Sequence, residues 1–174
     1  MRLSTDLDTI DLELLRILQM NGRISQGALA EQVGLSSPAV AERLRKLEDR
    51  GVIRGFHAQL DPRYLALDIT AFIEVRVDSS THFPKFLAKA VAHEEIMECH
   101  AITGDGSHLI KIRTKNTATL EALLAEIQRW PGVVKTRTSL VLSTNKETLA
   151  LPLAHADEVV SEGRRERGTK AAQT

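Results

Sequence analysis

A run of hydroxyl, small and basic residues between Ser36 and Arg54 has the chemistry of a segment that meets DNA. Ser36 and Ser37 open the run with hydroxyls and backbone N–H groups that can hold a phosphate. Five cations outnumber three acids in this segment, which leaves it at a net charge of +2. The cations are Arg43, Arg45, Lys46, Arg50 and Arg54. Small residues followed by cations let a helix bring its first turn to the bases and its later turns to phosphate.

Two short capped helices joined by a tight turn are expected to position these residues. Ser25 is the predicted N-cap of the first helix, and Gly34 is the left-handed residue that ends it. Ser36 caps the second helix, and Pro38 falls in its first turn. Helical spacing puts Val40, Leu44 and Leu47 on the core side and Ala39, Arg43 and Lys46 on the other side. The pattern predicts a helix-turn-helix; a helical hairpin with a solvated charged face is the alternative.

The predicted DNA-binding residues fall into three groups. Ser36 and Ser37 would hold phosphate at the start of the recognition helix. Ala39, Val40 and Arg43 would lie nearest the bases, although Val40 also fits a core position. The expected contacts to the DNA backbone are Arg23, Lys46, Arg50 and Arg54.

The charge of the whole chain limits the kind of DNA binding. The 174 residues include 23 basic and 23 acidic side chains, so the chain is neutral and does not coat nucleic acid indiscriminately. Contact with DNA must therefore be local. It should depend on two recognition helices paired in a dimer, because one weakly charged helix neutralises few phosphates. Glu42 repels phosphate but can accept a hydrogen bond from cytosine N4. An assembly module that no longer reads DNA is therefore a second hypothesis.

Cysteine content and hydropathy exclude several other classes. Cys99 is the only cysteine, which rules out an intramolecular disulfide and a thiolate zinc cluster. No apolar run approaches the ~20 residues of a membrane span, and no signal-peptide pattern opens the chain. We therefore expect a soluble, cytoplasmic protein with no membrane partner.

Residues 1–60 are expected to form the DNA-binding domain. Asp8 and Asp11 resemble a capping box at the start of a first helix, whose apolar stripe closes at Asn21. The β-prone segment from Val52 to Leu60 would form a wing. Residues 61–67 would be a hinge linker.

Residues 68–143 change to a mixed pattern. Residues 69–77 alternate between the two faces of a predicted strand, and residues 79–94 are expected to form a helix. Residues 96–103 and 108–114 would form two strands joined across a Gly-rich turn, and residues 133–142 would form a last strand. Thr117 would cap a helix that ends at Trp130. This βαββαβ order predicts an α+β chain whose second domain is ferredoxin-like. Residues 144–174 would be a tail whose polar end, from Gly163, is disordered.

One face of this sheet is expected to lack a helical cover. An unbulged hairpin would place Glu98 opposite Arg113 and His100 opposite Lys111. Further residues expected on that side are Glu74, Arg76, Lys135 and Arg137, beside the apolar Phe72, Ile102 and Leu109. Such a face predicts a second sheet in a twofold dimer, or else an ordinary solvated face.

In order and spacing the chain resembles the Lrp/AsnC family, the feast/famine transcriptional regulators. The resemblance runs from about Leu7 to Lys146. Its pieces are LDTIDLELLRILQMNGRIS, LAEQVGLSSPAVAERLRKLEDRGVI, the TGDG turn at Thr103 to Gly106, and PGVVKTRTSLVL. It implies a helix-turn-helix domain, dimers through the sheet (RAM) domain, further assembly into octamers or other rings, and an amino-acid or similar effector bound between dimers.

Carried over by position, the resemblance nominates the central hairpin turn for effector contact. Its residues are Gly104, Asp105, Gly106, Ser107 and His108, with Thr136 and Thr138 on the last strand as weaker candidates. Glycines let a ligand carboxylate reach backbone N–H groups, and an acid can take its ammonium. Many relatives read G-D-x-D-Y-L at this turn, whereas this chain lacks the second acid and the phenol. The effector's identity therefore stays open, and a plain hairpin turn is the alternative.

An enzyme is the remaining rival. Similar architectures are known as sirohaem decarboxylases, and such a site would need well-placed histidines. His100 and His108 fall on opposite faces of the predicted hairpin, and no HExxH, nucleophile elbow, GxGxxG or Walker loop is present. We therefore expect no enzyme activity, no catalytic residue, no metal and no cofactor.

Overall fold

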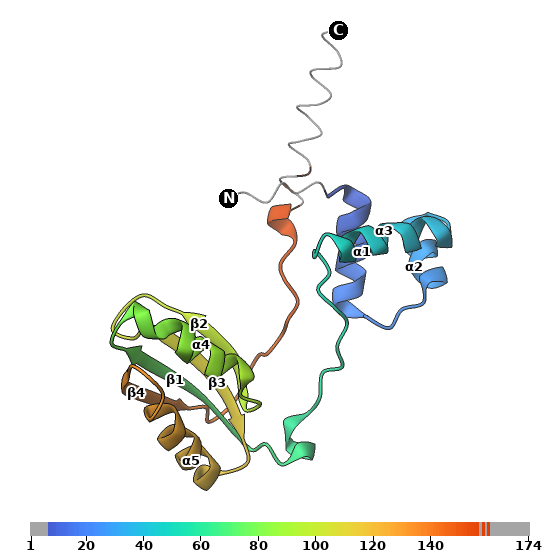
Figure 1. Cartoon of the computed structure of the whole chain (residues 1–174). Helices are drawn as coiled ribbons and strands as arrows, with labels where there is room; N and C mark the ends of the chain where they lie inside the picture. Colours follow the sequence, from blue (N-terminus) through green and yellow to red (C-terminus); the bar gives the residue numbers. More distant parts are fainter. Residues whose placement is uncertain (1–6, 157, 159, 161–174) are drawn as a thin grey trace. The chain divides into compact units, whose positions relative to one another are not determined.

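The computed structural model describes residues 7–156, 158 and 160 of the chain (Figure 1). Contacts divide these residues into two compact units, and each is described by itself. One unit extends to Ala58 and also takes in the described residues from Glu147 onward. The other comprises Gln59–Lys146.

The first unit contains three helices: α1 (Thr9–Met20), α2 (Gln26–Val33) and α3 (Ser37–Asp49). The predicted capping box is confirmed, because Asp8 accepts a hydrogen bond from the Asp11 backbone N–H at 2.8 Å and Asp11 accepts one from the Asp8 N–H at 3.1 Å. The helices pack around Leu14, Leu29 and Val40, which are buried. Local capping thus fixes where each helix begins, and apolar packing holds the three together.

The connection between α2 and α3 is built as predicted. The Ser25 hydroxyl accepts a hydrogen bond from the Ala28 N–H at 3.1 Å, and Gly34 adopts the left-handed conformation with φ of 69°. The Ser36 hydroxyl accepts one from the Ala39 N–H at 3.4 Å. These residues define a helix-turn-helix.

Val52–Leu60 forms no strand, contrary to the expectation of a β wing. A strand needs a neighbour for its backbone N–H and C=O groups, and the described part of this unit contains no other strand. The β-prone residues therefore form an irregular connection to a short 3-10 turn, Pro62–Leu65, which Asp61 caps.

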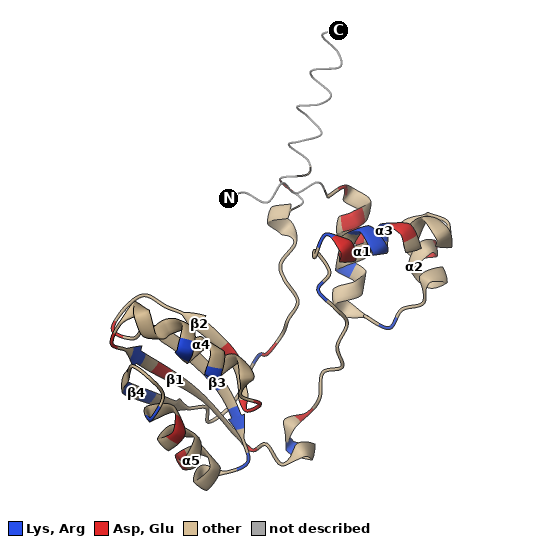
Figure 2. Ribbon diagram, viewed as in Figure 1, with Lys and Arg blue, Asp and Glu red and all other residues tan. Residues whose placement is uncertain are grey.

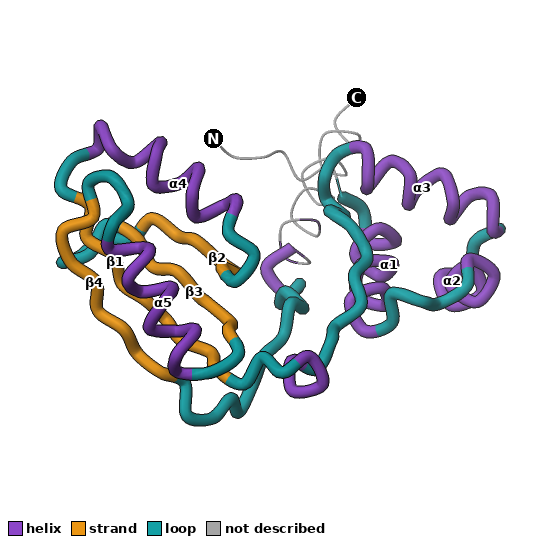
Figure 3. Tube along the Cα trace, turned by 60° about the horizontal axis from the view of Figure 1, so that its bottom comes forward, coloured by secondary structure: helices purple, strands orange, loops and turns teal. Residues whose placement is uncertain are grey.

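The second unit has the predicted βαββαβ order. Its elements are β1 (Ile69–Val77), α4 (Phe83–Ala92), β2 (Ile96–Ala101), β3 (His108–Thr114), α5 (Thr117–Gln128) and β4 (Val133–Leu140). The antiparallel sheet has the order β2-β3-β1-β4, and both helices lie on one face (Figure 3). Phe86, Ile127 and Trp130 pack there against Ile73 and Ile110 of the strands.

Several boundaries differ from the sequence prediction. A 3-10 turn, Ser80–His82, precedes α4, and Asn116 rather than Thr117 caps α5. The predicted β2–β3 register was wrong by two residues, because β2 ends at Ala101, which pairs with His108, and residues 102–107 form the turn. A separate irregularity lies between Ile96 and Glu98. Glu98 lies opposite Lys111, and His100 lies opposite Leu109.

The first part of the expected tail packs with the helical unit. The Gln19 side-chain amide accepts a hydrogen bond from the Leu151 N–H at 2.6 Å and donates one to the Leu151 carbonyl at 3.2 Å. Val160 is buried, with 8% of its surface exposed. We call the described residues from 147 to 160 the C-terminal arm. The segment from Gly163, predicted to be disordered, lies outside the described residues.

Candidate functional site

The start of α3 presents the small polar residues that the sequence predicted there. Ser36 and Ser37 are exposed, and Ala39 is partly exposed one turn into the helix. The cations Arg23, Lys46, Arg50 and Arg54 are exposed as well. Val40 is fully buried in the helical core, which confirms the core position that the sequence also allowed and excludes the place next to the bases. Its apolar side chain is what anchors α3 to the other helices.

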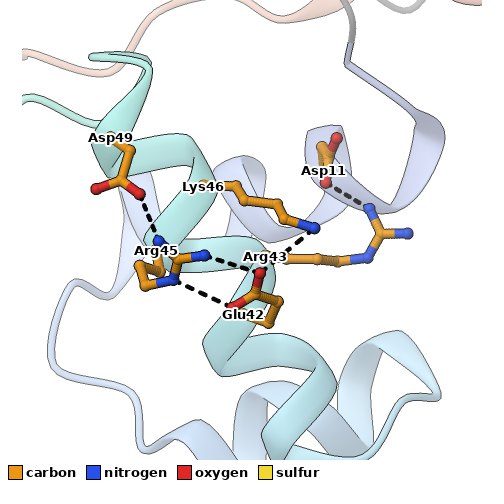
Figure 4. A network of polar contacts seen from close by, with 6 residues as sticks. All are labelled: Asp11, Glu42, Arg43, Arg45, Lys46 and Asp49. Atoms are coloured by element: carbon orange, nitrogen blue, oxygen red, sulfur yellow. Dashed lines mark hydrogen bonds and ion pairs between the residues drawn. The ribbon is translucent and has the colours of Figure 1, made fainter.

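Arg43 is directed at α1 rather than outward. Its Nη1 lies 2.8 Å from a carboxylate oxygen of Asp8 and 2.7 Å from one of Asp11 (the Asp11 contact is drawn in Figure 4). The hydrogen bond with Asp8 is the main reason that the pKa of Arg43 is raised, against a smaller opposing effect of burial. The expected base contact is not supported, because both acids of the capping box already hold this guanidinium.

Four exposed charged residues of α3 are paired with one another within the helix (Figure 4). Arg45 contacts Glu42 at 2.9 Å and Asp49 at 2.7 Å, and Lys46 lies 3.4 Å from Glu42. The hydrogen bond from Arg45 lowers the pKa of Glu42. Counting charges along the sequence did not reveal this pairing, although the i, i+3 and i, i+4 spacings were the available signal.

The β2–β3 turn combines an open glycine with a closely packed one. Gly104 is exposed with φ of 117°, a conformation that other residues rarely adopt. Gly106 is buried, and a Cβ there would lie 2.4 Å from Cγ of Glu74. The turn therefore needs Gly106 so that the Glu74 side chain can pack against it.

Ser107 and His108 stabilise the turn from the helix-covered side. The Ser107 hydroxyl accepts a hydrogen bond from the Val77 N–H at 3.0 Å and donates one to the Val75 carbonyl at 3.1 Å. It also lies 2.9 Å from Nδ1 of His108.

The His108 ring is buried among aromatic side chains. Its surface is 1% exposed, and its centroid lies 4.8 Å from that of Phe83 and 4.7 Å from that of Phe86. Burial lowers the pKa of His108. The nomination of His108 as an effector contact is therefore corrected, since its side chain belongs to the core of this unit.

Thr136 and Thr138 also lie on the helix-covered side. They pair with Val75 and Ile73 of β1, whose side chains are buried beneath the helices. The Thr136 hydroxyl accepts a hydrogen bond from the Gln128 amide at 3.0 Å. The structure thus separates these two threonines from the opposite, uncovered face.

The uncovered face carries the charged residues predicted for it. Glu74 lies opposite Arg137, and Arg76 lies opposite Lys135, in the β1–β4 register. These four residues and Asp105 of the turn line a cavity of about 240 Å³. Figure 2 shows the basic and acidic residues on β1 and β4. Of the nominated effector residues, only Asp105 lines this cavity. The sequence pattern had not predicted the cavity itself.

Within residues 7–156, 158 and 160, no three His, Cys, Asp or Glu side chains come together as metal ligands. No helix in that part of the chain is long and apolar enough to cross a membrane. His100 and His108 do lie on opposite faces of the sheet, since one is exposed on the uncovered face and the other is buried beneath the helices.

One unit is a helix-turn-helix domain, and the other is a ferredoxin-like domain. This combination defines a class of DNA-binding regulator. A winged helix-turn-helix DNA-binding profile matches residues 7–54, and the Lrp/AsnC ligand binding domain matches residues 70–151. The chain belongs to the Lrp/AsnC family of transcriptional regulators, as its sequence resemblance indicated.

Two curated relatives illustrate the similarity in sequence. The HTH-type transcriptional regulator FL11 of Pyrococcus abyssi is 39% identical over 147 residues, covering 84% of this chain and 97% of that protein. The leucine-responsive regulatory protein of Salmonella typhimurium is 40% identical over 146 residues, covering 82% and 89%.

Solved structures share the fold. A transcriptional regulator of Neisseria meningitidis in complex with L-Met has a TM-score of 0.81 and 33% identity, over 86% of this chain and 99% of that one. A feast or famine regulatory protein of M. tuberculosis complexed with L-methionine has a TM-score of 0.78 and 31% identity, over 83% and 98%.

Proposed function

We propose that this regulator binds specific operators as an oligomer and that an amino-acid effector adjusts this binding. The observation that carries the proposal is the exposed first turn of α3, where Ser36 and Ser37 precede a row of cations. Backbone N–H groups and hydroxyls at a helix start hold phosphate well. Such a function places the protein with the chromosome, in the cytoplasm, and we propose no catalytic activity.

The proposed DNA contacts come from residues of the helical unit whose side chains are exposed or partly exposed. Ser36 and Ser37 would bind phosphate, and Ala39 would approach the bases. Contacts to the DNA backbone would come from Arg23, Lys46, Arg50 and Arg54. In a dimer, two such helices would lie about 34 Å apart, or a multiple of that, to match a near-palindromic operator.

The uncovered sheet face supports the proposed dimer. Phe72 is 36% exposed there, and Ile102 and Leu109 are partly exposed. Glu98 pairs with Lys111 at 3.1 Å, so apolar and charge-paired groups alternate on this face. A twofold partner presenting the same face would cover these apolar side chains. Assembly of dimers into octamers or other rings is part of the proposal.

The proposed effector site includes the exposed part of the β2–β3 turn. Two solved relatives hold L-methionine. Of the nominated turn residues, Gly104 and Asp105 are exposed, and Gly106 shapes the turn. We propose that effector binding favours one arrangement of dimers and thereby changes which operator half-sites are reached together.

Genome-wide mapping of bound DNA tests this function. We expect discrete sites that share a near-palindromic motif and whose occupancy changes when amino acids are supplied. The purified protein should bind the motif at least about a thousandfold more tightly than random duplex. Equal affinity for every duplex, or a strictly monomeric protein at working concentrations, would overturn the proposal. Lys46→Ala should weaken binding to all duplexes alike.

A further inference from the structure

The side of α3 that faces away from the helical core is centred on Glu42, Arg45 and Asp49. Val40 and Leu47 are buried and mark the side of α3 that packs against the core. Since an α-helix turns by about 100° per residue, Glu42, Arg45 and Asp49 fall on the opposite side. All three are exposed. This side of the recognition helix is therefore the one open to the major groove of DNA.

Arg45 is held by acids on this side of α3 (Figure 4). Its Nε and Nη2 atoms donate hydrogen bonds to the two carboxylate oxygens of Glu42, at 3.1 Å and 2.9 Å. Its Nη1 atom donates one to Asp49 at 2.7 Å. A contact with two oxygens fixes the plane of the guanidinium as well as its position. Arg43, the other arginine of α3, is instead turned toward α1.

The contact with Glu42 leaves the terminal end of the Arg45 guanidinium available. Glu42 takes the Nε side, so Nη1 and Nη2 each keep an N–H group that has no acceptor among the residues that the structure describes. The Asp49 contact at Nη1 is single and exposed, so it can give way at little cost. The side chain of Arg45 is 60% exposed. Arg45 therefore offers a pair of terminal N–H donors to a partner outside the chain.

The charges around Arg45 favour a base over a phosphate as that partner. The charges of Glu42, Arg45, Lys46 and Asp49, which are paired with one another, sum to zero. The two carboxylates repel phosphate, whereas the edge of a base pair is uncharged and presents donors and acceptors at fixed positions. A neutral network that orients its donors therefore suits the readout of bases.

Guanine is the base that matches these donors. Its edge in the major groove offers two acceptors, O6 and N7. Adenine offers one acceptor beside a donor, thymine offers one acceptor beside a methyl group, and cytosine offers a donor. Of the four bases, guanine alone satisfies a pair of guanidinium N–H groups.

We propose that Arg45 reads a guanine in each operator half-site and that Glu42 is the positioning residue that orients its guanidinium. This inference rests on the proposed operator binding. It adds which side chain distinguishes the bases and which base that side chain selects. It also moves the main base contact of α3 from Arg43, which the sequence suggested, to Arg45.

Selection of duplexes from a random library tests the inference. The full-length protein should select a motif with an invariant G·C pair in each half-site. Replacing that pair with A·T should weaken binding at least about tenfold, because a bidentate contact is lost. Arg45→Lys keeps the charge but lacks the planar pair of donors, so it should bind both duplexes within about twofold of each other. The other positions of the motif should keep their preferences.

Two further variants separate base readout from charge. Lys46→Ala is the matched control, because it removes a neighbouring exposed cation from α3 and should weaken binding to both duplexes alike. Glu42→Gln should bind random duplex more tightly but discriminate less between the G·C and A·T operators, because a carboxylate no longer holds Arg45. A purely structural role of Glu42 would change stability and not this ratio. Circular dichroism shows whether each variant is folded.

Two results would overturn the inference and leave operator binding intact. In one, Arg45→Lys selects the same motif as the original protein, with the G·C pair included. In the other, Arg45→Ala weakens binding to both duplexes by the same factor, which would assign Arg45 to phosphate. Unchanged discrimination in Glu42→Gln would overturn the positioning role of Glu42. If the original protein selects no motif at all, the proposed function itself fails, and this inference fails with it.

Discussion

At the scale of single residues, Arg43 links the recognition helix to the first helix of the same unit. Its guanidinium lies within 2.8 Å of both Asp8 and Asp11, and the side chain of Asp11 is only 9% exposed. A carboxylate with so little access to water is costly to leave without a cation. Arg43 is therefore a positioning residue for α3.

Arg43→Ala should destabilise the helical unit by about 1–3 kcal/mol, since it leaves Asp11 without its cation. Thermal unfolding followed by circular dichroism measures this. In an Asp11→Asn background the same substitution should cost less, because the pair is already broken. Unchanged stability combined with lost operator specificity would instead assign Arg43 to a base contact.

The stabilisation by Asp8 should depend on pH. Burial raises the pKa of Asp8, but the Asp11 backbone N–H and Arg43 outweigh this effect and hold the pKa below 3.8. Stability from such a group is complete above the unfolded pKa and is lost as pH falls through the folded one. The stability difference between the original protein and Arg43→Ala should therefore be constant above about pH 5 and shrink below about pH 4. A constant difference down to pH 2 would contradict this.

His108 predicts a second pH effect, in the sheet unit. Burial holds the pKa of His108 below 6.5, so the unfolded chain takes up a proton more readily than the folded one. Its stabilising contribution is complete above pH 6.5 and falls as pH drops toward the folded pKa. Unfolding experiments between about pH 7.5 and pH 5 should show this loss, and His108→Leu should remove that pH dependence. The same loss in His108→Leu would mean that another group is responsible.

At the scale of elements, cations on the outer surface of α3 form ion pairs with acidic residues of the same helix. Glu42 contacts both Arg45 and Lys46, and Asp49 contacts Arg45. Exposed pairs of this kind are weak, so DNA can break them. Glu42 nevertheless lowers the attraction of α3 for phosphate.

Glu42→Gln should increase affinity for DNA by about two- to fivefold at 0.1 M salt and steepen the salt dependence. Glu48→Gln is the matched control, because it removes the same charge from α3 and Glu48 has no ion-pair partner among the described residues. It should have the smaller effect. Equal gains from both variants would show that only net charge matters. Fluorescence anisotropy at several salt concentrations provides the measurement.

At the scale of the whole molecule, the proposed dimer depends on a face that the helices leave uncovered. Phe72→Glu should convert the dimer to a monomer, because a charge would replace an exposed apolar group on β1, a central strand of that face. Phe72 is 36% exposed and lies outside the buried core, so the fold should survive. Light scattering reports the mass.

Val91→Glu is the control for that experiment. Val91 is 82% exposed on α4, on the other side of the sheet, and its substitution should leave the mass unchanged. Dissociation by Val91→Glu alone would place the interface on the helices.

The C-terminal arm adds a contact that reaches across the chain, from Leu151 to Gln19. Gln19→Ala should lower the free energy of unfolding of the helical unit by about 0.5–1 kcal/mol, because two hydrogen bonds are lost at an exposed site. Gln32→Ala on α2 is the matched control and should have little effect. Chemical denaturation of both variants tests this, and equal stabilities would show that the arm contact contributes nothing measurable.

The sequence by itself determined the features that depend on near neighbours. Ser25 and Ser36 each begin a helix by accepting a hydrogen bond from a backbone N–H three residues further on. Gly34 ends a helix through its own left-handed backbone conformation. The alternation of residues 69–77 determined which side of β1 is buried, because successive side chains in a strand point to opposite faces. The family resemblance rested on the same local segments.

Only the tertiary structure decided which distant side chains meet. Arg43 and Asp8 are 35 residues apart, and their pairing depends on how α3 packs against α1. The longer turn, with β2 ending at Ala101, changed the partner of Glu98, and the packing of α4 decided that His108 is buried. Local patterns constrain the faces of each element, whereas register and packing between elements depend on the whole set of long-range contacts.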